Sequence, residues 1–88
     1  MNHLFIPYSA LLHATAPLTF TLCGASVSLR LAERDRERCF LSLPVDFLFG
    51  GVVPCRCVSV PVGTSFEVEY RGVVCEVRIG RRFEVTDA

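Results

Sequence analysis

The chain has 88 residues, of which 51% are hydrophobic and 20% charged, and its formal net charge at pH 7 is zero. This length allows one small domain and excludes the large two-layer enzyme folds. A disordered chain would be poorer in apolar residues and richer in net charge, and a neutral chain has no general electrostatic attraction to nucleic acid or to anionic membranes. We therefore expect a single β-rich domain over residues 1–88.

The N-terminal third of the chain is free of formal charge, because the first 29 residues contain no Asp, Glu, Lys or Arg. An export signal needs basic residues before an unbroken apolar stretch, and a bilayer span needs about 20 predominantly apolar residues. Pro7, His13 and Pro17 interrupt this segment. We therefore expect no membrane segment and a cytoplasmic protein. Residues 8–16, between the prolines, predict a short helix that packs on an open sheet face.

From residue 18 onward, apolar and polar residues alternate, which is the pattern of half-buried strands. Residues 18–22 and 27–31 fit a hairpin with 23–26 as its loop, so that Leu22 faces Val27 and Phe20 faces Leu29. Residues 33–38 are all charged and of mixed sign, which predicts an exposed hairpin tip. The alternation resumes at once and predicts a further strand over residues 39–43.

Prolines and glycines mark the middle of the chain. Pro44 ends the preceding strand and suits a first helical turn, so residues 45–49 predict one short turn of helix that stops at Gly50. Residues 52–62 predict one extended stretch. Pro54 and Pro61, near its ends, favour an edge strand or a bulge.

The C-terminal third has the clearest alternation. Residues 66–70 and 73–79 predict a hairpin joined by a two-residue turn at Arg71-Gly72, because glycine adopts the positive φ that this turn requires. A three-residue loop at 80–82 would then lead into a last strand that contains Phe83 and Val85.

These segments predict a mainly β fold, with α+β as the alternative. The expected architecture is a small antiparallel β-meander, sandwich or partly open barrel of six to seven short strands, with one short N-terminal helix.

The chain has five cysteines, and an odd number without an export signal argues against a disulfide framework. We expect reduced, mostly buried thiols. Cys55 and Cys57 would lie on one face of a strand, but no second Cys pair accompanies them, and zinc needs four ligands. A zinc site therefore remains only an alternative, and no metal or cofactor is expected. No hydrolase elbow, phosphate-binding loop or other catalytic motif is present, so we expect no enzymatic activity.

Apolar residues exceed what one sheet face can bury. Phe47, Leu48 and Phe49 are consecutive and cannot all point inward from one strand or helix. Phe40 and Val74 occupy the outward phase of their predicted strands. An apolar surplus of this kind is typical of a second packed layer or of a binding surface.

Acidic residues on the outer face of the C-terminal hairpin form a second anomaly. The predicted register places Glu67 directly opposite Glu76, with Glu69 beside them. Like charges in that position destabilise a sheet. Either Arg78, on the diagonal from Glu67, relieves the repulsion, or the site accepts Arg or Lys from a partner. The candidate interface residues are therefore Phe40, Phe47, Leu48, Phe49, Glu67, Glu69 and Glu76.

All nine basic residues are arginine, which indicates a GC-rich genome, either bacterial or phage. We expect a non-catalytic accessory protein that binds another protein, for example a phage or mobile-element inhibitor of a host defence complex, such as an anti-CRISPR. The alternatives are a small structural or homo-oligomeric subunit of a larger bacterial or phage assembly, and a nucleic-acid-binding or zinc-binding module. Nucleic acid is the less expected partner, because four Arg meet five acidic residues from position 65 onward.

Overall fold

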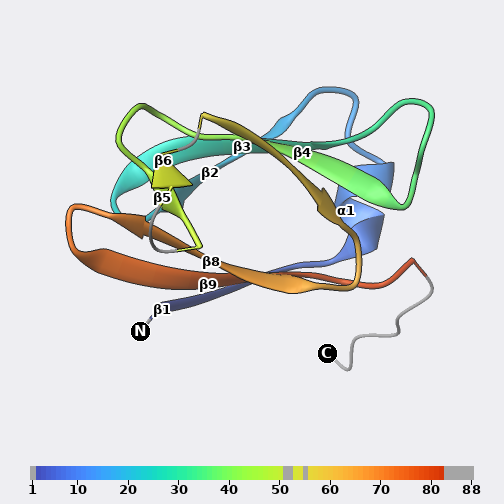
Figure 1. Cartoon of the computed structure of the whole chain (residues 1–88). Coiled ribbons are helices and arrows are strands. Elements are labelled where there is room, and N and C mark those ends of the chain that lie inside the picture. Colours follow the sequence, from blue (N-terminus) through green and yellow to red (C-terminus); the bar gives the residue numbers. More distant parts are fainter. Residues whose placement is uncertain (1, 51–52, 55, 83–88) are drawn as a thin grey trace.

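The computed structural model describes residues 2–50, 53–54 and 56–82. Nine strands and one helix follow in chain order: β1 (Asn2–Ile6), α1 (Tyr8–Leu12), β2 (Leu18–Leu22), β3 (Ala25–Leu31), β4 (Arg38–Ser42), β5 (Leu48–Phe49), β6 (Val53–Pro54), β7 (Cys57–Pro61), β8 (Ser65–Tyr70) and β9 (Val73–Ile79). They form two stacked sheets, one in the order β1-β9-β8-β5-β6 and one in the order β2-β3-β4-β7 (Figure 1). The predicted mainly β class with one short helix is confirmed, and of the expected architectures the structure has the sandwich. The described residues form nine strands, where six to seven were predicted.

The β8–β9 hairpin has the predicted register, with Tyr70 opposite Val73 and Val68 opposite Cys75. Its turn residues Arg71 and Gly72 have φ values of 52° and 82°. Positive φ at both central positions is the signature of the type I′ turn, whose twist matches that of the flanking strands.

The β2–β3 hairpin differs from the predicted register by two residues. Cys23 and Gly24, with φ values of 53° and 81°, form a two-residue turn, so Leu22 lies opposite Ala25 and Phe20 opposite Val27. The predicted four-residue loop is wrong because the tight turn allows one further residue pair. A shift of two residues keeps every side chain on its predicted face, so the burial pattern was predicted correctly.

Residues 2–6 form a strand that the sequence pattern did not assign. β1 pairs in parallel with β9, at the edge of the five-stranded sheet. Its neighbour β9 therefore lies between β1 and β8. The predicted last strand, with Phe83 and Val85, lies outside the described residues.

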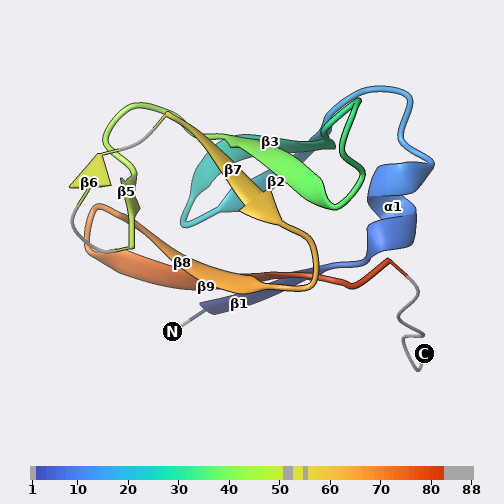
Figure 2. The same ribbon diagram turned by 45° about the vertical axis from the view of Figure 1, so that its right-hand side comes forward.

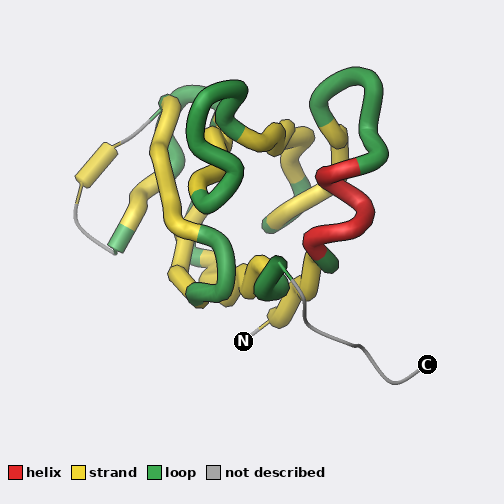
Figure 3. Tube along the Cα trace, turned by 90° about the vertical axis from the view of Figure 1, so that its right-hand side faces the viewer, coloured by secondary structure: helices red, strands yellow, loops and turns green. Residues whose placement is uncertain are grey.

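The helix α1 falls within the predicted range and lies at one end of the sandwich, between the two layers (Figure 2). Tyr8 and Leu11 are its buried residues. The Tyr8 hydroxyl donates a hydrogen bond of 3.1 Å to the carbonyl oxygen of Arg36, which ties the helix to the charged tip between β3 and β4. The end-on view shows the helix beside the two layers (Figure 3).

The segment 45–49 is not helical, which corrects the predicted helical turn. Asp46 has a φ of 79°, and the next residues form β5, with Leu48 opposite Glu69 and Phe49 opposite Val68 of β8. One isolated helical turn has little intrinsic stability, whereas β8 offers an edge for a backbone ladder. The prolines of the following stretch lie on edge strands as predicted: Pro54 on β6 and Pro61 on β7.

The core fills the space between the inner faces of the two sheets. Its largest fully buried side chains are Phe47, Leu29, Leu41, Ile79, Val68, Val77, Cys39 and Cys75. Because both sheets contribute, each layer has one face toward the core and one face toward solvent. The two outer faces are therefore the surfaces on which a binding site can be built.

Candidate functional site

The outer face of the five-stranded sheet brings together four of the predicted interface residues. Successive residues of a strand point to opposite faces, and the register aligns the outward residues in rows across the sheet. One row runs from Leu48 through Glu69 to Val74. The next runs from Glu67 to Glu76. We call these five residues, Leu48, Glu67, Glu69, Val74 and Glu76, the acidic face.

The predicted opposition of Glu67 and Glu76 is confirmed by the register. Glu67 is exposed, whereas Glu69 and Glu76 are partly buried. Three carboxylates thus share a small area in two adjacent rows, two of them directly opposite each other. Like charges so placed repel and lower the stability of the sheet.

The strand β1 adds a histidine and an aromatic ring at the border of the acidic face. His3 Nδ1 lies 3.2 Å from Glu76 Oε1. The next row places the Arg78 guanidinium 5.0 Å from the centre of the Phe5 ring, and Phe5 is 38% exposed. Arg78 sits diagonally from Glu67 in the register, so the acidic face is bordered by a basic group stacked on an aromatic one.

Phe47 and Phe49 belong to the core, which corrects their assignment to an interface. Phe47 is completely buried and stacks on Tyr70, with ring centres 4.6 Å apart. Phe49 packs against Phe66 at 5.5 Å and is partly buried. Of these three consecutive apolar residues, Phe47 and Phe49 point toward the core and Leu48 points to the outer face. The helical turn predicted for residues 45–49 did not anticipate this alternation of inward and outward side chains.

Phe40 lies on the outer face of the other sheet, on the opposite side of the molecule from the acidic face. The Arg30 guanidinium sits over its ring at 4.8 Å, and a groove of about 590 Å³ runs between Phe40, Arg30, Arg38 and residues 32–35. Arg38 is held in place by Ser59, to whose hydroxyl and carbonyl oxygens it donates hydrogen bonds of 2.8 and 3.1 Å. Phe40 therefore cannot contribute to a single interface with the glutamates.

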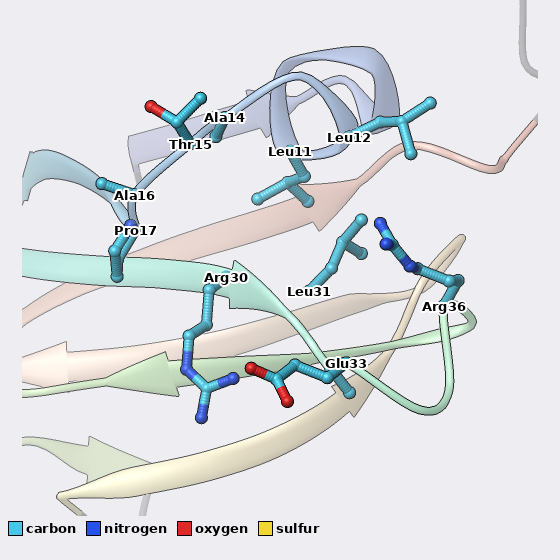
Figure 4. Close-up of a pocket in the computed structure, with 11 residues that line it drawn as sticks. Leu11, Leu12, Ala14, Thr15, Ala16, Pro17, Arg30, Leu31, Glu33 and Arg36 are labelled. Carbon is cyan, nitrogen blue, oxygen red and sulfur yellow. The ribbon is translucent and has the colours of Figure 1, made fainter.

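A second hollow, of about 230 Å³, lies between α1, residues 14–17 and the end of β3. In the close-up, Leu11 and Leu31 point toward each other from the helix and the strand, and Arg30 points toward Glu33 (Figure 4). This mixture of apolar and charged groups fits a junction between elements better than a ligand site.

None of the described cysteines forms a disulfide: Cys23 is partly buried, Cys39 and Cys75 are buried, and Cys57 is exposed. Burial raises the pKa of Cys39 to about 11. Burial also raises the pKa of Cys23 to about 12, helped by a hydrogen bond and charge interaction with Cys75. Because the thiolate is the nucleophilic and metal-binding form, Cys23 and Cys39 stay protonated and structural at neutral pH.

The alternative zinc site falls partly outside the described residues. Cys57 lies on β7, and Cys55 is outside the described residues. Among residues 2–50, 53–54 and 56–82, no three His, Cys, Asp or Glu side chains cluster closely enough to hold a metal ion.

The sequence pattern did not predict that β1 borders the acidic face. Leu4 and Ile6 alternate with His3 and Phe5, which is the same period-two signal used elsewhere, but a five-residue segment before a proline carried no indication of its partner strand. The pairing with β9 is parallel and joins segments far apart in the chain, so no local turn predicts it.

Within the described ranges, no helix has the length and apolar character that crossing a membrane requires. Comparisons of the chain with protein-family models, with curated proteins and with solved structures give no match.

Proposed function

We propose that this protein is a non-catalytic protein-binding module whose acidic face binds a basic segment of another protein. The observation that carries the proposal is the direct opposition of Glu67 and Glu76, with Glu69 in the adjacent row. This arrangement costs the free protein stability. An arginine or lysine from a partner would offset that repulsion. The acidic face is therefore more stable in such a complex than when it is exposed to water.

The composition of the acidic face suits such a partner. Carboxylates accept paired hydrogen bonds from a guanidinium group, and Leu48 and Val74 supply apolar contact at the end of the same face. Complementary charge accelerates association and selects partners. We therefore infer that the bound segment carries at least one arginine together with apolar side chains.

A cytoplasmic inhibitor of a host defence complex, for example an anti-CRISPR, is the concrete role that we propose for this module. Proteins that handle nucleic acid present basic surfaces to the phosphate backbone. An acidic sheet face would complement such a surface. This role, and the bacterial or phage setting, stay predictions that rest on the size of the chain and the chemistry of the face.

The first test is the stability of Glu67→Gln. Removing one of two opposed charges should raise the free energy of unfolding by about 0.2–1 kcal/mol, measured by urea unfolding at neutral pH and low salt. Glu33→Gln, which removes one charge from the exposed tip between β3 and β4, is the matched control and should change stability by less than about 0.5 kcal/mol. A Glu67→Gln protein no more stable than the wild type would contradict the repulsion on which the proposal rests.

Binding is tested with three immobilised proteins: the wild type, the triple variant Glu67→Gln/Glu69→Gln/Glu76→Gln, and the control Glu33→Gln. Proteins from a bacterial lysate that the wild type and the control retain should be absent from the triple variant. Each such protein should then bind the purified wild type directly, at least tenfold more tightly than the triple variant and with a rate that falls as salt rises. Equal retention by all three proteins, or retention by none, would refute the proposed face.

A further inference from the structure

The strand β2 has two features that the proposed function does not use. It forms one edge of the four-stranded sheet, with β3 on one side and no described strand on the other (Figure 1). Its sequence, Leu18-Thr19-Phe20-Thr21-Leu22, reads the same in both directions. A palindromic strand can pair with a second copy of itself in antiparallel orientation so that identical residue types face each other.

In β2, the backbone N–H and C=O groups of Thr19 and Thr21 are the ones that point away from β3. The β-turn at Cys23-Gly24 joins the carbonyl of Leu22 to the N–H of Ala25, so the backbone groups of Leu22 point toward β3. Because these directions alternate along an antiparallel strand, the groups of Phe20 also point toward β3. Those of Thr19 and Thr21 point away from the sheet.

The edge of β2 lacks the features that normally prevent strands from pairing. Natural edges carry charges, prolines or bulges. Of the other three edge strands, β6 contains Pro54, β7 contains Pro61 and β1 contains His3. Within β2 there is no charge and no proline, and Thr19 and Thr21 are exposed while Phe20 is only partly buried.

We propose that two copies of this chain pair through their β2 strands, antiparallel and centred on Phe20, into a dimer with one continuous eight-stranded sheet. In this register Thr19 of each copy faces Thr21 of the other, and each such pair exchanges two backbone hydrogen bonds. Phe20 faces Phe20 of the second copy, where side chains come closest.

This register satisfies both the backbone and the side chains, and a shift by two residues toward the turn would instead place Thr19 opposite Cys23, a turn residue with a φ of 53°. A shift by one residue would place threonines against the apolar inner face. Extension beyond Leu18 meets Pro17, which has no N–H to donate. The pairing is therefore limited to the palindrome, and it covers Phe20 and Leu18, which are partly buried in one copy.

The oligomeric state is measured by sedimentation velocity from micromolar to millimolar protein, in reductant. The wild type should shift from 9.8 kDa toward twice that mass as concentration rises. The variant Thr19→Lys/Thr21→Lys places lysines opposite lysines and should raise the dimer dissociation constant at least tenfold. The control Ser26→Lys adds a charge on the same outer face but one strand inside the edge, and it should dimerise like the wild type.

Charge complementation separates direct pairing from misfolding. Thr19→Glu/Thr21→Glu alone should also be monomeric, whereas an equimolar mixture with Thr19→Lys/Thr21→Lys should restore a mixed dimer. Amide hydrogen exchange should slow at Thr19 and Thr21, but not at Phe20, as the wild-type concentration rises. A wild type that remains monomeric, a dimer that survives the lysine variant, or a mixture that stays monomeric would each overturn the proposal.

The triple glutamine variant of the acidic face should still dimerise, because that face lies on the other sheet. Loss of partner binding and loss of dimerisation are therefore separate results.

Discussion

Phe47→Ala is expected to lower the free energy of unfolding by about 3–5 kcal/mol. The side chain is completely buried and stacks on Tyr70 at 4.6 Å with an angle of 16° between the rings. The substitution forfeits the transfer free energy of a phenyl group and leaves a cavity between the sheets. Small domains have total stabilities of about 5–15 kcal/mol, so urea unfolding followed by circular dichroism should show a much earlier midpoint.

The neighbouring residue supplies the control for this prediction. Leu48 points to the outer face opposite Glu69, so Leu48→Ala should cost less than about 1 kcal/mol. Phe47→Leu, which keeps most of the apolar volume, should fall between the two. Equal losses for Phe47→Ala and Leu48→Ala would show that the alternation of residues 47–49 is wrong.

The second large effect is a loss of stability at alkaline pH that depends on Cys39. Burial raises the pKa of its thiol from 9.0 to about 11 in the folded protein. Below pH 9 both the folded and the unfolded chain keep this proton, so the full stabilisation is present. Between pH 9 and 11 the unfolded chain binds fewer protons than the folded chain, so the free energy of unfolding falls, by roughly 3 kcal/mol for the Cys39 thiol.

The measurement is urea unfolding at intervals from pH 7 to 11, in reductant. No lysine is present to titrate in this range, since all nine basic residues are arginine. Cys39→Ala lowers stability at neutral pH and should make the decline between pH 9 and 11 shallower by the Cys39 contribution, while the contribution of Cys23, whose pKa burial also raises, should remain. Cys57→Ala, at an exposed position, should keep the wild-type decline. Parallel curves for the wild type and Cys39→Ala would refute the assignment of this loss to Cys39.

Local sequence patterns were sufficient to predict the β8–β9 hairpin. The turn at Arg71-Gly72 and the register of β8 with β9 follow from alternation and from one glycine, because a two-residue turn leaves one way to pair the strands. The same register predicted that Glu67 faces Glu76. At Cys23-Gly24 the same turn type was missed, because Ala25 and Ser26 also fit a loop and alternation cannot distinguish registers that differ by two residues.

The candidate interface was predicted only in part. Glu67, Glu69, Glu76 and Leu48 share one face because they lie on adjacent strands of one sheet. Phe47 and Phe49 turned out to be core residues. In the predicted helical turn over residues 45–49, the rings of Phe47 and Phe49 could not both point toward the core. In the structure this segment pairs with β8 as a short strand, and both rings point inward.

The sequence alone determined that this chain forms a β-rich domain with hairpins of defined faces and an opposed pair of glutamates, because alternation and turn chemistry act over a few residues. Only the tertiary structure decided which sheet each hairpin joins, that β1 pairs with β9, and that Phe40 and the glutamates lie on opposite sides. These features depend on contacts between residues that are far apart in the chain. No local sequence pattern specifies which distant residues come into contact.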